Sequence, residues 1–253
     1  MPNRISEQEH SVLIVAHPDD EVLWFSSLLS EIDQVIIIFR DYDQQPDIGK
    51  LRTEAITALP FKVVCLGISE AGSYALADWA KPEMSPYGLS LESITPNISV
   101  TQNYERNFGL IRSQLKTLLS PKMNVFTHNP WGEYGHEDHV QLYRIINNLR
   151  TEMNFKMWVS CYISKRSTLL ARNYVESGVL EPIKCCINTK LAKEIANIYK
   201  CHHCWTWTDD WVWNQSEYFL PNPRLLLSGD KSPSLLYSNQ LQRIPSQFNA
   251  NST

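Results

Sequence analysis

The sequence predicts an α/β fold, in which helices cover both faces of a mostly parallel, Rossmann-like sheet. Short apolar runs alternate with helix-like segments along the first 66 residues, which is typical of strand–helix–strand units with right-handed crossovers. The apolar runs are continuous, as expected for strands that are buried on both faces. Clusters of ionisable residues follow two of these runs, so polar chemistry is expected at strand ends.

In the first part of the chain, strands are predicted where the apolar runs fall, and helices where apolar residues recur at helical spacing. The expected strands are residues 11–16, 34–40 and 61–66. The expected helices are residues 21–29 and 50–59, the second of which ends at Pro60.

The alternation resumes after a long loop. Residues 69–100 are rich in Gly, Pro, Ser and Asn without a clear period, and a loop of this length is usually functional or mobile. The expected later helices are residues 104–119, 137–153 and 190–200, and the expected later strands are residues 124–128 and 156–162.

These elements indicate a single domain over residues 11–227, because no repeat or composition shift marks a second one. Residues 1–10 are expected to form a flexible tail. Residues 228–253 are polar and are expected to form an extended or partly disordered C-terminal tail. The aromatic-rich residues 205–219 are expected to pack a small C-terminal extension, with one or two rings at the cleft.

The bulk composition limits the function. With 43% hydrophobic and 20% charged residues, the chain can form a sizeable globular core. A net charge of −4 gives no electrostatic reason to expect nucleic acid or an anionic membrane as a partner. No apolar run approaches the ~20 residues of a membrane span, and the first residues do not resemble a signal peptide. A cytoplasmic protein with reduced cysteines is therefore expected, and a homo-oligomer remains possible.

The first ionisable cluster, at residues 16–21, follows the first predicted strand. His17 and Asp20 offer an imidazole nitrogen and a carboxylate oxygen, which suit zinc. Asp19, on the same tight turn, is placed to act as a base toward water at the metal. A helix cap is the structural alternative. A nucleotide-binding turn is disfavoured because this segment has no glycine.

The second cluster, at residues 135–139, follows the strand predicted at residues 124–128. His136 and His139 are three residues apart at a helix start, which places them on one face. One of them would complete a His–Asp–His metal set. The other would stay free to stabilise an oxyanion and to protonate a leaving group. Surface or capping histidines are the alternative.

The motifs AHPDDE at residues 16–21 and THNPWGEYGHEDH at residues 127–139 resemble those of the PIG-L/LmbE-like deacetylases. The resemblance covers residues 11–220 and implies an LmbE-like fold. It also implies a zinc-dependent hydrolase that removes an N-acetyl group from an N-acetylglucosamine-type sugar conjugate, such as a glycolipid. By the same resemblance, the metal ligands are His17, Asp20 and His139, the general base is Asp19, and His136 stabilises the tetrahedral intermediate.

Three further residues are expected to contact the substrate. Arg52 resembles an arginine that holds substrate in this family, and a solvated helix charge is its alternative. Glu70 stands near the place where many members carry an aspartate after Leu-Gly. Trp131 lies between the strand end and His136 and is expected to touch the substrate. Glu137 replaces a proline of many members, with little expected effect on metal binding.

Other interpretations remain open. The same metal site would also suit a non-sugar amide or an ester, and a non-catalytic binding module is a further alternative. A nucleotide-binding domain is disfavoured by the missing glycines. Cys201 and Cys204 suggest a zinc finger, but no second pair lies at finger spacing, so a structural metal is not expected there.

Overall fold

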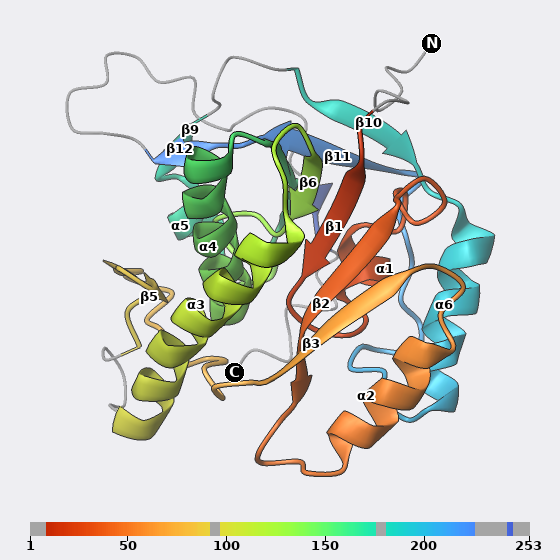
Figure 1. Ribbon diagram of the computed structural model, residues 1–253, viewed down its shortest axis with the longest axis horizontal. Coiled ribbons are helices and arrows are strands. Elements are labelled where there is room, and N and C mark those ends of the chain that lie inside the picture. Colours follow the sequence, from red (N-terminus) through yellow and green to blue (C-terminus); the bar gives the residue numbers. More distant parts are fainter. Residues whose placement is uncertain (1–8, 92–96, 176–180, 226–241, 245–253) are drawn as a thin grey trace.

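The centre of the molecule is a seven-stranded sheet with helices on both faces (Figure 1). The computed structural model describes residues 9–91, 97–175, 181–225 and 242–244. The strand order is β10-β11-β7-β6-β1-β2-β3, in which the five strands from β7 to β3 are parallel. Strand β11 pairs antiparallel with β7, and β10 pairs antiparallel with β11. The predicted fold class, a mostly parallel sheet covered on both faces, is confirmed.

The parallel strands are β1 (Ser11–Val15), β2 (Gln34–Asp41), β3 (Val63–Ser69), β6 (Asn124–Thr127) and β7 (Lys156–Ser160). The antiparallel pair is β10 (Ile183–Cys186) and β11 (Ser216–Pro221). The helices are α1 (Asp20–Trp24), α2 (Ile48–Thr57), α3 (Ile98–Leu118), α4 (Glu137–Met153), α5 (Thr168–Ala171) and α6 (Thr189–Cys201). Short pairings involve β4 (Met84–Ser85), β5 (Gly88–Leu89), β8 (Tyr162–Ile163), β9 (Tyr174–Val175), β12 (Arg224–Leu225) and β13 (Gln242–Arg243).

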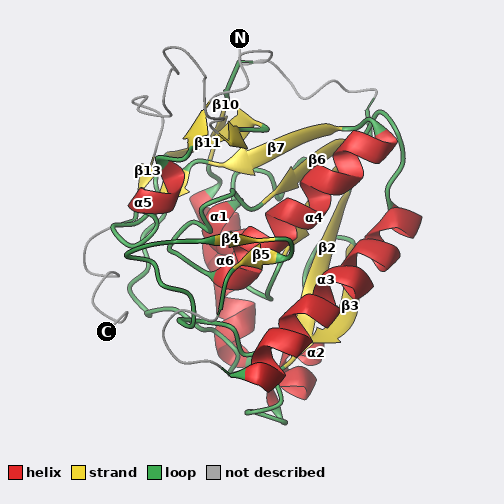
Figure 2. Cartoon of the chain, turned by 90° about the vertical axis from the view of Figure 1, so that its left-hand side faces the viewer, coloured by secondary structure: helices red, strands yellow, loops and turns green. Residues whose placement is uncertain are grey.

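Side chains of alternate strand residues build two separate cores. In β1, Val12 and Ile14 belong to the core that includes α3 and α4, which lie along one face (Figure 2). Leu13 and Val15 belong to the core that includes residues of α1, α2 and α6. All four side chains are buried, and each such burial is worth about 1.5–3 kcal/mol. The continuous apolar runs of the sequence therefore reflect strands that are covered on both sides.

The strand order creates a switch point beside β1. The chain proceeds from β1 to β2 and β3 on one side, and then returns through α3 to β6 on the other. Strand β6 pairs with β1 in parallel, with Ile14 opposite Thr127. The segments that leave β1 and β6 therefore emerge side by side, at the place where open α/β sheets bind their ligands.

Two predicted helices differ from the structure by five residues or more at one end. Helix α1 stops at Trp24 instead of residue 29. Beyond it, Ser26 and Ser27 donate hydrogen bonds to the Glu217 carboxylate of β11, which holds the chain out of helical geometry. Helix α3 begins at Ile98 instead of residue 104, because the Asn97 side chain accepts a bond from the Val100 amide as an N-cap.

Two predicted strands also differ. Strand β3 runs on to Ser69, past Gly67, whose φ of +67° requires glycine-like freedom. This extension carries Glu70 to the carboxyl edge of the sheet, where its amide donates to the Asp41 carbonyl. The strand predicted over residues 156–162 is divided into β7 and β8.

The predicted tails fall mostly outside the described residues, which exclude residues 1–8, 226–241 and 245–253. Of the C-terminal tail, β13 is described, and it pairs in parallel with β8. Within the described ranges, none of the helices combines the length and apolar character that crossing a membrane requires.

Replacing Glu217 should destabilise the fold. Its carboxylate is fully buried and accepts hydrogen bonds from Ser26, Ser27 and Tyr162. Glu217→Ala leaves these donors without a partner, so we expect the free energy of unfolding to fall by about 2–4 kcal/mol in urea denaturation. Glu194→Ala, on the exposed face of α6, is the control and should change it by less than about 0.5 kcal/mol. Equal effects of the two variants would contradict this assignment.

Candidate active site

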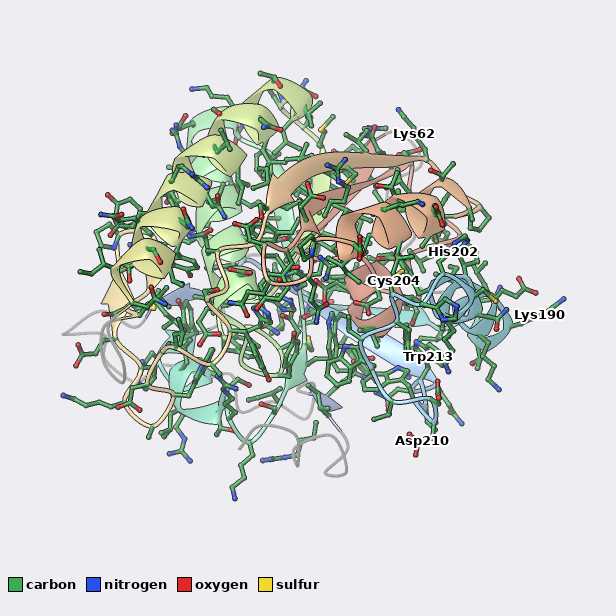
Figure 3. All side chains as sticks on the ribbon, turned by 90° about the horizontal axis from the view of Figure 1, so that it is seen from below. Lys62, Lys190, His202, Cys204, Asp210 and Trp213 are labelled. Carbon is green, nitrogen blue, oxygen red and sulfur yellow. The ribbon has the colours of Figure 1, made fainter. Side chains whose placement is uncertain are left out.

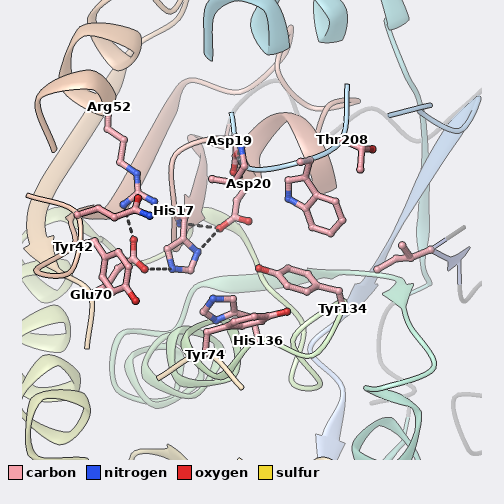
Figure 4. Close-up of a pocket in the computed structure, with 14 residues that line it drawn as sticks. His17, Asp19, Asp20, Tyr42, Arg52, Glu70, Tyr74, Tyr134, His136 and Thr208 are labelled. Carbon is pink, nitrogen blue, oxygen red and sulfur yellow. Dashed lines mark hydrogen bonds and ion pairs between the residues drawn. The ribbon is translucent and has the colours of Figure 1, made fainter. Parts of the chain in front are cut away.

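A cavity of about 500 Å³ opens at the carboxyl edge of the sheet (Figure 4). This size is typical of small-molecule sites. Residues that follow β1, β2, β3 and β6 contribute to its wall, together with a segment after α6. The lining residues are His17, Asp19, Asp20, Tyr42, Gln45, Arg52, Glu70, Tyr74, Tyr134, His136, Thr206, Trp207, Thr208 and Ile244.

The structure brings together the three residues predicted as metal ligands. One ligand atom each of His17, Asp20 and His139 lies within 4.8 Å of the others. The Asp20 Oδ2 atom is 3.2 Å from His17 Nδ1 and 3.3 Å from His139 Nε2. The His139 Nε2 atom is buried and has no hydrogen-bond partner. A buried nitrogen of this kind, facing an imidazole and a carboxylate, fits a catalytic zinc site that keeps an open position.

Each of the two imidazoles is oriented by a carboxylate on its far side. His17 Nε2 lies 3.3 Å from Asp138 Oδ2, and His139 Nδ1 lies 2.8 Å from Glu133 Oε2. A proton on each of these outer nitrogens leaves the opposite lone pair directed toward Asp20. Carboxylate–histidine pairs of this type fix the tautomer of metal ligands.

Glu133 is itself held firmly. It accepts hydrogen bonds from the Asn129 amide at 2.9 Å and from the Ser160 hydroxyl. Burial disfavours its charge, but His128 and His139 outweigh that cost and lower the pKa of Glu133 to about 2. His128 Nδ1 lies 3.1 Å from Glu133, while its Nε2 accepts from the Ala16 amide. The same Nε2 atom lies 3.4 Å from Asp20 Oδ2, so the buried His128 ring contacts a cavity-lining carboxylate from the core side.

Asp20 is fixed by helix α1. Its Oδ1 atom accepts from the indole of Trp24 at 3.0 Å, and its Oδ2 atom accepts from the His17 amide at 2.7 Å. Burial raises the pKa of the Asp20 carboxyl, but His139 and His128 outweigh it and hold the pKa well below the usual range. Asp20 is therefore an anion in the folded protein and suits a cation.

Asp19 lies on a strained turn beside the candidate metal ligands. Its backbone adopts a left-handed conformation with φ of +90°, which is strained for a non-glycine residue. Burial, assisted by the charge of Asp20, raises the pKa of Asp19 to about 7, against the lowering effect of hydrogen bonds from Thr206. A base with a pKa near neutrality is well matched to proton transfer.

His136 stands at the N-terminus of α4 as its cap. Its Nδ1 atom accepts from the Asp138 amide at 3.1 Å, so the neutral ring carries its proton on Nε2. Burial, followed by the neighbouring His17 and His139, holds the pKa of His136 well below its usual value. The turn before it needs Gly132, where φ is +66° and a Cβ would lie 2.6 Å from the His136 carbonyl oxygen.

Arg52 and Glu70 both line the cavity, as an ion pair with 2.5 Å between Arg52 Nη1 and Glu70 Oε1. Arg52 is only 6% exposed, which excludes the alternative of a solvated helix charge. Glu70 Oε2 lies 3.9 Å from His17 Nε2, so the pair adjoins the candidate metal site (Figure 4).

Trp131 requires a correction. Its side chain is fully buried and is not among the cavity-lining residues, so it is not placed to touch a substrate. The indole points into the core and donates to the Tyr162 carbonyl at 2.7 Å. Among the aromatic residues of the 205–219 stretch, Trp207 reaches the cavity instead.

The Cys201–Cys204 segment forms no metal site among the described residues. Cys201 is exposed, whereas Cys204 is buried and its thiol lies near the Tyr199 carbonyl.

Several residues of the site were not predicted. Glu133 and Asp138 lie inside the second motif, but only the folded geometry shows that they orient the histidines. Tyr74 contributes a ring whose centroid lies 5.0 Å from that of His136. Thr206 lies 187 positions after Asp19, and no sequence pattern links the two.

Comparisons with known proteins agree with this fold. No protein-family model and no curated protein sequence matches the chain. A deacetylase of teicoplanin biosynthesis in complex with teicoplanin is 13% identical, with a TM-score of 0.50 over 83% of this chain and 97% of that one. A deacetylase–bog complex from the same pathway is 12% identical, with a TM-score of 0.52 over 87% of this chain and 100% of that one. The zinc-inhibited form of teicoplanin deacetylase Orf2 is 12% identical, with a TM-score of 0.51 over 87% of this chain and 100% of that one.

At such identities the similarity establishes the fold alone. The chain shares the fold of these solved deacetylases, as the resemblance of its two motifs predicts.

Glu133→Gln should weaken metal binding without removing a ligand. The amide no longer supplies the charge that orients His139, and loss of such a partner typically costs 10–100-fold in metal affinity. We expect a loss in this range for Zn²⁺, measured by competition with a chromogenic chelator. Glu152→Gln on the exposed side of α4 is the control and should leave the affinity unchanged. Unchanged affinity in Glu133→Gln, with the fold intact by circular dichroism, would contradict the proposed orientation.

Proposed function

We propose that this protein is a zinc-dependent N-deacetylase that hydrolyses the N-acetyl group of an N-acetylglucosamine-type sugar conjugate. The observation that carries the proposal is the convergence of His17, Asp20 and His139 beside Asp19 and His136. This group lies at the switch point of a deacetylase-like fold, in a cavity large enough for a sugar. The products would be acetate and a free amine.

His17, Asp20 and His139 would hold the zinc ion through Nδ1, Oδ2 and Nε2. When bound, zinc would polarise an amide carbonyl and make water more acidic. The residues around it determine where protons go and how charge is stabilised.

Asp19 would act as the general base. Its pKa of about 7 allows the carboxylate to accept a proton from the attacking water near neutral pH. The new carbon–oxygen bond forms at the acetyl carbon while Asp19 takes the proton. When the carbon–nitrogen bond breaks, that proton is available to the departing amine.

His136 would stabilise the negative oxygen of the tetrahedral intermediate. Its Nδ1 atom is occupied by the Asp138 amide, which leaves Nε2–H as a donor. Because its pKa is lowered, the ring is a neutral donor that is already in place before the reaction.

The rest of the cavity suits a sugar. Arg52 and Glu70 offer a donor and an acceptor for hydroxyl groups beside His17. Tyr74 and Trp207 offer ring surfaces from other sides of the cavity. A deacetylase of the same fold is known in complex with teicoplanin, which supports a sugar conjugate as the substrate class.

The second candidate is the same hydrolysis on a non-sugar amide or ester. The metal cluster and Asp19 do not distinguish these substrates, and the mixture of aromatic and polar residues in the cavity is what favours the sugar. A binding module without activity is disfavoured because all five predicted metal and catalytic side chains are present and converge.

Acetate release from a panel of N-acetylated sugar conjugates tests the proposal. The zinc-loaded protein should release acetate, and Asp19→Asn should lower kcat by about 10²–10⁴-fold because proton transfer is lost. Zinc content should be unchanged in that variant. Asp47→Asn, an exposed residue before α2, is the control and should retain full activity.

Two results would contradict parts of this proposal. Full activity of zinc-loaded Asp19→Asn would exclude Asp19 as the base. Release from simple amides or esters but from no sugar would move the substrate to the second candidate.

A further inference from the structure

Residues 202–213, here called the aromatic segment, follow α6 and pack against α1 (Figure 3). Trp213 is anchored by a hydrogen bond of 2.6 Å from its indole to the Val22 carbonyl. The ring of Trp207 packs edge-on against that of Trp24, with centroids 5.2 Å apart. The mechanism above assigns no step to this segment, although it forms part of the cavity wall.

Within the segment, Thr206 makes two hydrogen bonds to the same oxygen of Asp19. Its hydroxyl donates to Asp19 Oδ2 at 2.6 Å, and its amide donates to the same atom at 3.1 Å. Neither of these two bonds uses the Oδ1 atom of Asp19. Thr206 and Asp19 both line the cavity, so this paired contact lies where the substrate would bind.

Asp19 has little else to fix its side chain. Its backbone amide donates to Glu21 Oε2 at 3.1 Å, which holds the turn but not the carboxylate. The adjacent carboxylate of Asp20 carries a like charge, and its oxygens bond to the His17 amide and the Trp24 indole instead. Thr206 therefore supplies the hydrogen bonds that hold the Oδ2 atom of this carboxylate.

We propose that Thr206 is a positioning residue for the reaction: it holds Oδ2 of Asp19 so that Oδ1 is presented to water in the cavity. This inference rests on the proposed function, because it needs Asp19 to be the base. The aromatic segment then has a role beyond packing, since it delivers Thr206 to the active site from the C-terminal part of the chain.

Substitutions at Thr206 can distinguish loss of its hydrogen bond to Asp19 from loss of the packing of the aromatic segment. The anchors at Trp213 and Trp207 do not involve the Thr206 side chain, so they remain when its hydroxyl is removed. Valine has nearly the shape of threonine, and Thr206→Val keeps the hydrogen bond that the backbone amide of residue 206 donates to Asp19. Thr206→Ser keeps the hydroxyl and loses only the methyl group.

The test is a double-mutant cycle with Asp19→Ala, using the zinc-loaded protein and its best substrate. We expect Thr206→Val to lower kcat by about 10–100-fold, because a small misplacement of a reacting group costs up to about 10²-fold. KM and zinc content should change less than twofold. Thr206→Ser should restore kcat to within about threefold, and Thr206→Val should cause no further loss once Asp19 is alanine.

Thr151→Val is the matched control, because its hydroxyl bonds to a backbone carbonyl on the exposed surface of α4. It should leave kcat unchanged. The proposal is overturned if Thr206→Val retains kcat within twofold, or if it causes the same loss in the Asp19→Ala background.

A thermal measurement keeps this test independent of the proposed function. If the wild type releases acetate from no substrate, the proposed function fails, and the contact is then tested by Tm. Loss of the hydrogen bond should lower Tm by about 2–4 °C in the wild type and by less than about 1 °C in Asp19→Ala. Equal shifts in both backgrounds would show that Thr206 does not hold Asp19.

Discussion

The parallel pairing of β1 with β6 is the constraint on which the site depends. The two motifs are more than a hundred residues apart, and this pairing, with Ile14 opposite Thr127, makes their strand ends neighbours. The Ala16 amide extends the contact one step beyond the ladder by donating to His128 Nε2. If the register between β1 and β6 shifted by one residue, each side chain of the shifted strand would turn to the opposite face of the sheet. Since both faces are packed by different helices, the register is strongly specified.

Burying so much charge at one sheet edge requires compensation at each group. Asp20 and Glu133 are almost fully buried, and both keep low pKa values because histidines face them. Unpaired charges in such surroundings would cost several kcal/mol each. The cluster therefore alternates anions with imidazoles, and His139 lies between the two carboxylates. The same arrangement that makes burial tolerable leaves His139 Nε2 directed at Asp20 without a hydrogen bond, which suits a metal ion.

The sequence was sufficient for the parallel part of the sheet and for the residues of the two clusters, because both follow from local patterns; the antiparallel strands β10 and β11 were not predicted. Apolar runs and helical spacing predicted the parallel strands, and the two motifs predicted which side chains converge. Contacts between distant segments were not predictable in this way. Glu217 of β11 accepts a hydrogen bond from Ser27, just after the end of α1. Thr206, which follows α6, donates a hydrogen bond to Asp19. Trp131 was misjudged because position in a loop does not show whether an indole faces the cavity or the core.

The aromatic packing around α1 links these distant segments to the chemistry. Trp24 donates to Asp20, and its ring contacts those of Trp207, Trp211 and Tyr134. These rings exclude water from one side of the acidic turn, which strengthens every electrostatic interaction there. Helix α1 is only five residues long and gives the turn little stiffness of its own. Rings from the C-terminal part of the chain therefore pack around the turn that carries the strained Asp19 and the neighbouring Asp20.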